Sequence, residues 1–175
     1  MAKNKPFSFL HVSRPEIDLD HKIEFNNPKV YEKGAENLNK LIKNKVLIQD
    51  DEDCLYIYEI ILNEISQTGI GCIASVEAYE KNIIKKHEYT KPVKEDDRVE
   101  NITKLEAQTG PVLLAYKNTD KISEAINKVK DQKPVYNVFA HDGSNHKIWV
   151  INNKNQIEKI LSEINSMKSL FIADG

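Results

Sequence analysis

Apolar residues recur at helical spacing in several segments of the chain, and these segments predict its helices. The clearest stripe runs from Val30 to Ile42, behind Pro28, which a first helical turn tolerates, and an asparagine at position 26 or 27 that can cap the helix. In another stripe, Val99, Ile102 and Leu105 share one face. The predicted helices cover residues 28–44, 75–82, 95–108, 120–131 and 155–167.

Short runs rich in branched and aromatic residues predict the strands. These runs cover residues 7–13, 46–49, 54–62, 69–75, 112–117, 135–140, 146–151 and 170–173. Residues 54–75 form a predicted antiparallel hairpin, and Asp142-Gly143-Ser144-Asn145 is a strong signal for a tight turn between two later strands. The fold class is therefore α/β (α+β mixed), with a mixed, partly antiparallel sheet flanked by helices in one compact unit over residues 1–175.

The last predicted strand is followed directly by Asp174-Gly175. A strand followed by Asp-Gly ordinarily leads into a turn or a loop. We therefore expect the chain to be a fragment of a longer protein, and the fragment itself to be inactive.

Composition narrows the function classes. The 25 basic and 27 acidic residues give a formal net charge of −2, which argues against nucleic-acid binding, although a local basic patch stays open. The longest apolar run, residues 54–62, is far shorter than the roughly 20 residues of a membrane span, and no apolar secretion signal follows Met1. We expect a cytoplasmic protein with no membrane contact.

The two cysteines lie in strand-like runs and outside any Cys-x-x-Cys pair. A disulfide between Cys54 and Cys72 is conceivable, but burial of both as small hydrophobic residues is the expected outcome. A structural zinc site has little support.

The segment from Lys85 to Arg98 holds the densest cluster of titratable residues. His87 beside Glu88 offers a base that titrates near physiological pH, with a carboxylate neighbour. Lys94 and Arg98 would share one helical face if the helix began early, an arrangement suited to holding a phosphate or carboxylate. The alternative is a solvated loop and helix start, in which acidic residues 95–97 complement the helix dipole. Both interpretations stay open.

Other polar residues follow predicted strands. Thr109 precedes one strand at a sheet end where α/β folds often bind ligands, Arg14 ends the first strand as a candidate anion contact, and Asp174 ends the last. Turn chemistry or surface exposure explains Thr109 and Arg14 equally well. His141, Asp142 and His146 flank a turn and rarely make a metal site in such a position, so we assign no metal. Trp149 is expected in the core.

A set of strings, taken in order, resembles the prokaryotic family catalogued as domain of unknown function 1015. The resemblance spans the chain and rests on the strings at residues 8–16, 54–58, 67–69, 86–90, 94–98, 108–112, 146–150 and 172–175. In that family the counterpart of Asp174-Gly175 continues into His-His-Arg, and a further segment precedes the first string. The resemblance adds Thr90 to the candidate site residues and gives weight to the functional interpretation of His87, Glu88, Lys94 and Arg98.

More loosely, the family's strand followed by Asp-Gly-His-His-Arg is similar to a pattern in the fold of ParB-type partition proteins, sulfiredoxin and a free-serine kinase, in which an equivalent Gly-x-His-Arg turn at a helix start holds nucleotide phosphates. This sequence has Asp174 and Gly175 of that pattern but not the His-His-Arg. This resemblance implies a nucleotide- or phosphate-binding, small-molecule kinase-like enzyme, with a nucleotide and Mg²⁺ as cofactors of the longer protein. His87, Glu88 and Asp174 would be catalytic, and Arg14, Thr90, Lys94, Arg98 and Thr109 would bind the cofactor. The alternative is a non-catalytic protein-interaction or regulatory module, and a homodimer is compatible with either.

Overall fold

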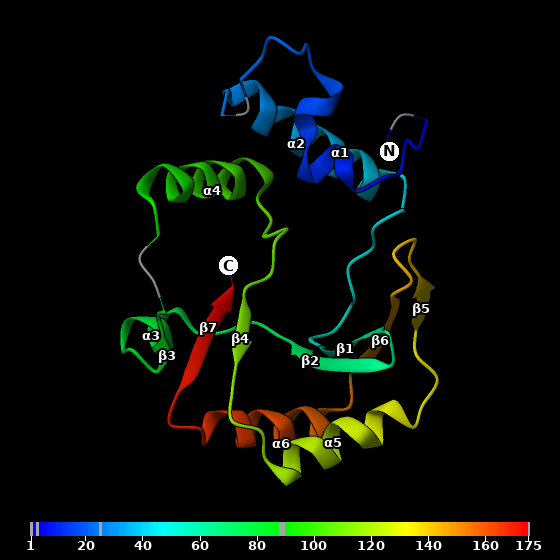
Figure 1. The fold of residues 1–175 in the computed structure, drawn as a ribbon, viewed down its shortest axis with the longest axis vertical. Helices are drawn as coiled ribbons and strands as arrows, with labels where there is room; N and C mark the ends of the chain where they lie inside the picture. The colour runs from blue at the N-terminus through cyan, green and yellow to red at the C-terminus, as the bar shows by residue number, and fades with distance from the viewer. Residues whose placement is uncertain (1, 3, 25, 88–89, 175) are drawn as a thin grey trace. The chain divides into compact units, whose positions relative to one another are not determined.

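The structure is a computed structural model that describes residues 2, 4–24, 26–87 and 90–174 (Figure 1). The chain divides into two compact units, each with a core of its own. Unit 1 comprises residues 1–49, 88–113 and 174–175, and unit 2 comprises residues 50–87 and 114–173. That the whole chain acts as one unit stays a prediction.

Unit 1 is helical, with α1 (Leu10–Ser13), the 3-10 helix η1 (Pro15–Asp18), α2 (Pro28–Lys43) and α4 (Pro92–Leu105). Helix α2 begins as predicted, because the Asn27 side chain accepts a hydrogen bond from the Lys29 N–H at 3.1 Å and Pro28 occupies the first turn. Buried Val12, Leu38, Leu41 and Leu105 form the core that joins α1, α2 and α4.

Both strands predicted in unit 1 are wrong. Residues 10–13 are helical, with the Ser13 and Arg14 N–H groups bonded to the carbonyls of Phe9 and Leu10, because fully buried Val12 packs against α2 instead of against a neighbouring strand. Residues 46–49 follow a Schellman motif. Lys45 has a φ of 55°, and the N–H of Val46 returns to the carbonyl of Leu41 at 2.9 Å.

Helix α4 also differs from its prediction. It begins at Pro92 and ends at Leu105, whereas the pattern indicated residues 95–108. Of the three apolar residues expected on its buried face, only Leu105 is buried, and Val99 and Ile102 are exposed. The helix therefore contributes little apolar surface to unit 1.

Unit 2 contains an antiparallel sheet (sheet A) of β1 (Leu55–Leu62), β2 (Ile65–Gly71), β5 (Tyr136–Phe139) and β6 (Asn145–Ile151). Its strand order is β2-β1-β6-β5. The predicted hairpin of β1 and β2 is confirmed, but β2 begins earlier than expected. The reason is a two-residue turn in which Asn63 and Glu64 have φ angles of 48° and 67°, the conformation of a type I′ turn.

The hairpin of β5 and β6 closes at the predicted turn. The Ala140 N–H bonds to the Ser144 carbonyl at 2.8 Å, and the Gly143 N–H bonds to the Ala140 carbonyl at 3.2 Å. Gly143 has a φ of 85°, which a three-residue hairpin loop requires at its last position and which glycine adopts without strain.

Helices α5 (Asp120–Lys130) and α6 (Lys154–Asn165) lie side by side against one face of sheet A (Figure 1). Thr119 and Asn153 cap them, each accepting a backbone N–H. The core between helices and sheet is made of Leu55, Ile57, Ile122, Ile126, Val129, Trp149, Ile151 and Ile160. Trp149 is buried as predicted, and its Nε1–H donates to the Gln132 carbonyl at 2.8 Å.

A second sheet (sheet B) has the order β3-β7-β4 and comprises β3 (Ile84–Lys85), β4 (Leu113–Ala115) and β7 (Leu170–Asp174). Its residues belong to unit 2 except for Leu113 and Asp174, which group with unit 1. Strand β7 runs parallel to β3 and opposite to β4 (Figure 1). The short helix α3 (Val76–Glu80), capped by Ser75, precedes β3. One antiparallel and one mixed sheet with helices confirm the predicted fold class.

The cysteine prediction is wrong in part. Both thiols are free, Cys54 is half-buried, and Cys72 is exposed because it lies beyond the last residue of β2. Within the described ranges, no helix combines the length and the apolar character that crossing a membrane requires.

Candidate functional site

The early start of α4 brings two predicted ligand residues onto one helix. Because α4 begins at Pro92, both Lys94 and Arg98 are helical and lie four residues apart, one turn along the same face. Both side chains are exposed, and neither forms an ion pair with another described residue. Lys91, at the N-cap, makes no side-chain hydrogen bond to the helix. Lys94 therefore lies in the first turn of α4, near the positive end of the helix dipole, and Arg98 lies one turn further along the helix.

Thr90, which precedes the N-cap residue Lys91, is tied to the first turn of α4. Its Oγ1 donates to Glu95 Oε2 at 2.8 Å. Glu95 lies in the first turn of α4, where a carboxylate is stabilised by the dipole. Thr90 and Glu95 thus shape the start of the helix that carries Lys94.

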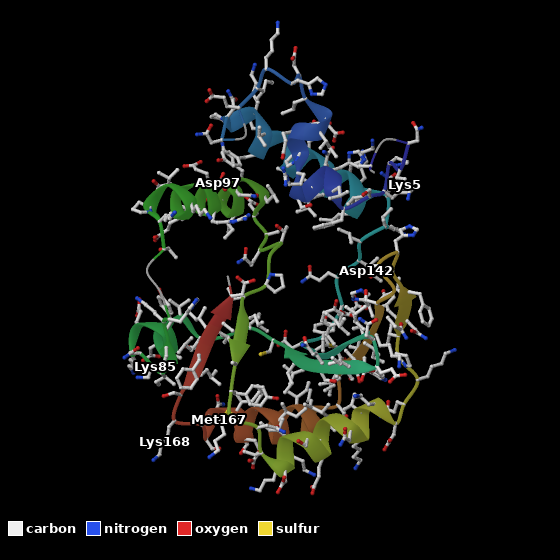
Figure 2. The ribbon with its side chains drawn as sticks, viewed as in Figure 1. Lys5, Lys85, Asp97, Asp142, Met167 and Lys168 are labelled. Carbon is white, nitrogen blue, oxygen red and sulfur yellow. The ribbon has the colours of Figure 1, made fainter. Side chains whose placement is uncertain are left out.

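Another side of α4 is acidic and packs against α2. The Tyr31 O–H donates to Asp97 Oδ1 at 2.7 Å, and a pocket beside them is lined also by Asp96 and Glu100. Asp97 is labelled on α4 in Figure 2. Burial of the phenol, the hydrogen bond to Asp97, and the charges of Asp97 and Glu100 raise the pKa of Tyr31 to about 12. Helix α4 therefore carries carboxylates on the side near Tyr31, and its cations Lys94 and Arg98 lie on another side.

Three further predicted residues also group with unit 1: Arg14 and Thr109, predicted to bind the cofactor, and Asp174, predicted to be catalytic. Arg14 caps the end of α1 and forms an ion pair with Glu16 at 2.5 Å, a hydrogen bond that raises the pKa of Arg14. Thr109 is half-buried in the segment after α4. Asp174 is exposed at the end of β7 and groups with unit 1.

The predicted acid–base pair stays a prediction. His87 is exposed and groups with unit 2, and Glu88 lies outside the described residues. The structure therefore brings together Thr90, Lys94 and Arg98, and leaves open the positions of His87, Glu88 and Asp174 relative to them.

The sequence analysis missed a chain of hydrogen bonds that runs from β1 to the tip of the β5–β6 hairpin. The Tyr58 hydroxyl lies 2.7 Å from His146 Nδ1, and His146 Nε2 lies 2.7 Å from Ser144 Oγ. Ser144 Oγ donates in turn to Asp142 Oδ1 at 2.5 Å. Hydrogen bonds from Ser144 lower the pKa of Asp142. A neutral imidazole protonated at Nε2 satisfies every group in the chain.

The hydrogen-bonded residues Tyr58, His146, Ser144 and Asp142 do not form a nucleophilic triad. Ser144 is 3% exposed, so its hydroxyl is closed to a substrate, and Asp142 bonds to the serine instead of orienting the histidine. Within the described ranges, no group of three or more histidine, cysteine, aspartate or glutamate side chains is arranged to hold a metal ion. The hydrogen bonds of His146, Ser144 and Asp142 order the tip of the β5–β6 hairpin. The sequence did not indicate these hydrogen bonds, because Tyr58 and His146 are 88 residues apart.

A buried ion-pair cluster also escaped the sequence analysis. Glu59 of β1 is 4% exposed and accepts hydrogen bonds from Lys130 Nζ at 2.6 Å and Ser66 Oγ at 2.8 Å. Lys147 Nζ lies 3.5 Å from its other oxygen, and Lys130 also reaches Thr68. Burial alone would raise the pKa of Glu59, but the hydrogen bonds and the two lysine charges outweigh burial and lower it. The cluster links α5 to sheet A.

The chain matches the family described as Protein of unknown function (DUF1015) over residues 1–175. Because the match covers the whole sequence, the chain belongs to this family, and the resemblance of its sequence strings is confirmed. Neither the curated proteins nor the solved structures gave a match. The looser similarity to the fold of partition proteins, sulfiredoxin and a free-serine kinase is thus without support from solved structures.

Proposed function

We propose that this protein is a nucleotide- or phosphate-binding enzyme of the small-molecule kinase type, in which Lys94 and Arg98 hold the phosphate. One observation supports the proposal above the others: two exposed cations, unpaired within the described residues, lie one turn apart in the first two turns of α4, whose N-cap residue makes no side-chain hydrogen bond. A guanidinium binds phosphate oxygens through two parallel hydrogen bonds, and an ammonium adds a mobile charge. The helix start adds backbone dipoles of the same sign.

The remaining predicted residues take supporting roles in this proposal. In phosphoryl transfer an acceptor hydroxyl attacks the terminal phosphorus, the bond to the nucleoside diphosphate breaks, and a base takes the hydroxyl proton. His87 is the proposed base, with Glu88 as its carboxylate neighbour in the sequence. Arg14 and Thr109 are proposed as further phosphate contacts, Thr90 as the residue that shapes the helix start, and Asp174 as a carboxylate of the reaction centre.

A nucleotide of this kind arrives with Mg²⁺, which neutralises phosphate charge. Magnesium in such sites is held mainly by phosphate oxygens and water, with only one or two protein carboxylates. The described residues, which hold no cluster of three or more metal-binding side chains, are compatible with that mode of binding.

Isothermal titration of the protein with ATP, ADP and inorganic phosphate, each with and without Mg²⁺, tests the proposal. We expect Lys94→Ala and Arg98→Ala each to weaken binding by about tenfold to a hundredfold, since a hydrogen bond to a charged group contributes about 1.5–3 kcal/mol. Lys104→Ala is the matched control, because Lys104 is an exposed lysine in the last turn of the same helix. The proposal fails if no ligand binds, or if all three variants bind as well as the original protein.

The alternative, a non-catalytic interaction or regulatory module, is favoured by a different observation. Every residue of β5 is exposed, although the strand carries no charged side chain. If the protein is such a module, it should bind no nucleotide, whether or not Lys94 and Arg98 are substituted. Substitutions in β5 should then change its assembly in solution.

A further inference from the structure

The ring of His11 in α1 lies between two hydrogen-bond acceptors of unit 1. Its Nδ1 is 2.9 Å from both carboxylate oxygens of Asp18 in η1. Its Nε2 is 3.2 Å from the backbone carbonyl of Lys5, a residue of the segment that precedes α1 and is labelled in Figure 2. The side chains of His11 and Asp18 are 19% and 22% exposed, so both are largely shielded from solvent. One imidazole therefore connects the segment before α1 to η1.

The chemistry of the two partners selects the charged form of the ring. A carboxylate and a backbone carbonyl oxygen accept hydrogen bonds but do not donate them, and a neutral imidazole carries one N–H. The imidazolium carries two, so it alone donates to Asp18 and to Lys5 at the same time. His146 provides the contrast, because its partners are the hydroxyls of Tyr58 and Ser144. A hydroxyl can donate or accept, so those contacts persist in either form of the ring.

When the ring of His11 loses its charge, Asp18 keeps the remaining N–H. The Asp18 carboxylate is held in place from α2, because Asn37 Nδ2 donates to Asp18 Oδ2 at 2.9 Å and to the His11 carbonyl at 2.7 Å. A hydrogen bond to a carboxylate is also roughly twice as strong as one between neutral groups. The proton therefore stays at Nδ1, and the contact that breaks is the one between Nε2 and the Lys5 carbonyl, where lone pairs would face each other.

Asp18 is the charged side chain that contacts the ring. Helix α1 packs against η1 and α2, and other charges on these elements are paired: Arg14 with Glu16 at the start of η1, and Lys33 with Glu36 on α2. Each of these pairs is neutral as a whole. Among the described contacts of the ring, the charge balance therefore depends on Asp18 and on the second proton of the imidazole.

We propose that the contacts of His11 with Asp18 and with the Lys5 carbonyl form a pH-dependent clasp (the His11 clasp), which holds residues 4–8 on unit 1. The clasp is closed when the ring is charged. As the pH rises through the range from about pH 5 to about pH 8, in which histidine loses its charge, the bond to Lys5 is lost and residues 4–8 are released. The clasp thereby couples the order of this segment to the ambient pH. This proposal is independent of phosphate binding by α4.

Amide hydrogen exchange of the whole chain at about pH 5.5 and about pH 8, corrected for the intrinsic rates, tests the His11 clasp. The amides of Lys5 and Ser8 report on it, because they donate to the Ala2 and Lys5 carbonyls at 2.8 Å and 2.9 Å and so close the turns of the segment. We expect their protection to fall by about tenfold at the higher pH, the effect of losing one hydrogen bond from a charged donor.

Two histidine variants separate the His11 clasp from other effects of pH. In His11→Gln the side chain does not titrate, so the protection of the Ser8 amide should be low at both pH values and the tenfold difference should vanish. His21→Gln is the matched control, because His21 is an exposed histidine of the same unit, and this variant should keep the difference. Spectra of the nitrogen-labelled ring of His11 should show a proton on both nitrogens at about pH 5.5 and on one at about pH 8.

Equal protection of the Lys5 and Ser8 amides at the two pH values in the original protein would overturn the proposal. A pH difference that survives in His11→Gln, or that disappears in His21→Gln, would assign the effect to another group. A His11 ring with one proton at both pH values would also exclude the clasp. The first comparison uses the original sequence, so it decides the matter even if His11→Gln fails to fold.

Discussion

Unit 2 is built around a β-sheet core, whereas unit 1 is held together by a small apolar core and by polar side chains that bridge its helices. In unit 2, eight buried apolar residues pack between sheet A and α5 and α6. In unit 1, four buried residues join α1, α2 and α4. We therefore expect the stability of unit 1 to depend more on single hydrogen bonds than the stability of unit 2.

The polar bridges of unit 1 converge on α2. His11 Nδ1 lies 2.9 Å from Asp18, and Asn37 Nδ2 donates both to Asp18 Oδ2 at 2.9 Å and to the His11 carbonyl at 2.7 Å. Tyr31 reaches Asp97 on α4. Because a small core leaves little stability in reserve, we expect unit 1 to open locally more often than unit 2. The proposed phosphate residues thus lie in the unit that a bound ligand could stabilise most.

The largest effect is expected in unit 2, from Glu59→Ala. The substitution leaves Lys130 and Lys147 without their buried carboxylate, and removing one partner of a buried ion pair costs about 3–5 kcal/mol. Urea unfolding followed by tryptophan fluorescence reports on unit 2, because Trp149 is in its core. Glu158→Ala, which removes an exposed carboxylate of α6, should change stability by less than about 0.5 kcal/mol. Equal effects of the two substitutions would contradict the role of the cluster.

A smaller effect is expected in unit 1, from Tyr31→Phe. The substitution removes the hydrogen bond to the Asp97 carboxylate, worth about 1.5–3 kcal/mol, and keeps the ring that packs between α2 and α4. Amide exchange of α2 and α4 should accelerate, while exchange of sheet A stays unchanged. Tyr79→Phe is the control, since the exposed Tyr79 contacts Lys86 through its ring. Acceleration in sheet A would show that the two units unfold together.

Acid should destabilise unit 2 through Glu59. The folded state holds the pKa of Glu59 below its ordinary value of 4.5. Its contribution is therefore complete above pH 4.5 and is lost as the pH falls through the lower folded value. The loss should be smaller than for Glu59→Ala, because a protonated acid still accepts hydrogen bonds. Unfolding of the original protein and of Glu59→Gln between neutral pH and about pH 3 should show a steeper decline for the original protein. Parallel declines would contradict this assignment.

The smallest effect compares the helix caps of the two units. Asn27 caps α2 and Asn153 caps α6, each by accepting one backbone N–H, so alanine at either position should cost about 1 kcal/mol. We expect this loss of about 1 kcal/mol to be a larger fraction of the stability of unit 1 than of unit 2, because unit 1 has the smaller core. Asn27→Ala should therefore raise the exchange rate across all of α2, and Asn153→Ala should affect only the first turn of α6. The same response in both helices would remove the distinction between the units.

The sequence predicted the parts of the fold that local interactions determine. Asn27, Ser75 and Asn153 cap helices in which apolar residues recur at helical spacing, and Gly143 marks the hairpin of β5 and β6. The aromatic run at residues 7–13 predicted a strand, but residues 10–13 are helical. The helix is favoured by contacts of Val12 with residues of α2 and α4, which a local pattern does not contain.

The candidate site was predictable to a lesser degree. Lys94 and Arg98 stood out because they are close in sequence, and the observed start of α4 places them on one helix. The Glu59 cluster depends on Lys130, which is 71 residues away, so no spacing rule could find it. Arg14 was selected as the end of a strand, and the structure shows it at the end of a short helix, paired with Glu16.

Hydrogen exchange with and without ligand is the most direct measurement of phosphate binding by unit 1. Peptides covering α4 should exchange more slowly when ATP with Mg²⁺ or inorganic phosphate is added, and peptides from sheet A should not change. Lys94→Ala with Arg98→Ala should abolish the protection of α4, and Lys104→Ala should preserve it. Protection confined to sheet A, or no protection at saturating ligand, would contradict the assignment of the phosphate site to α4.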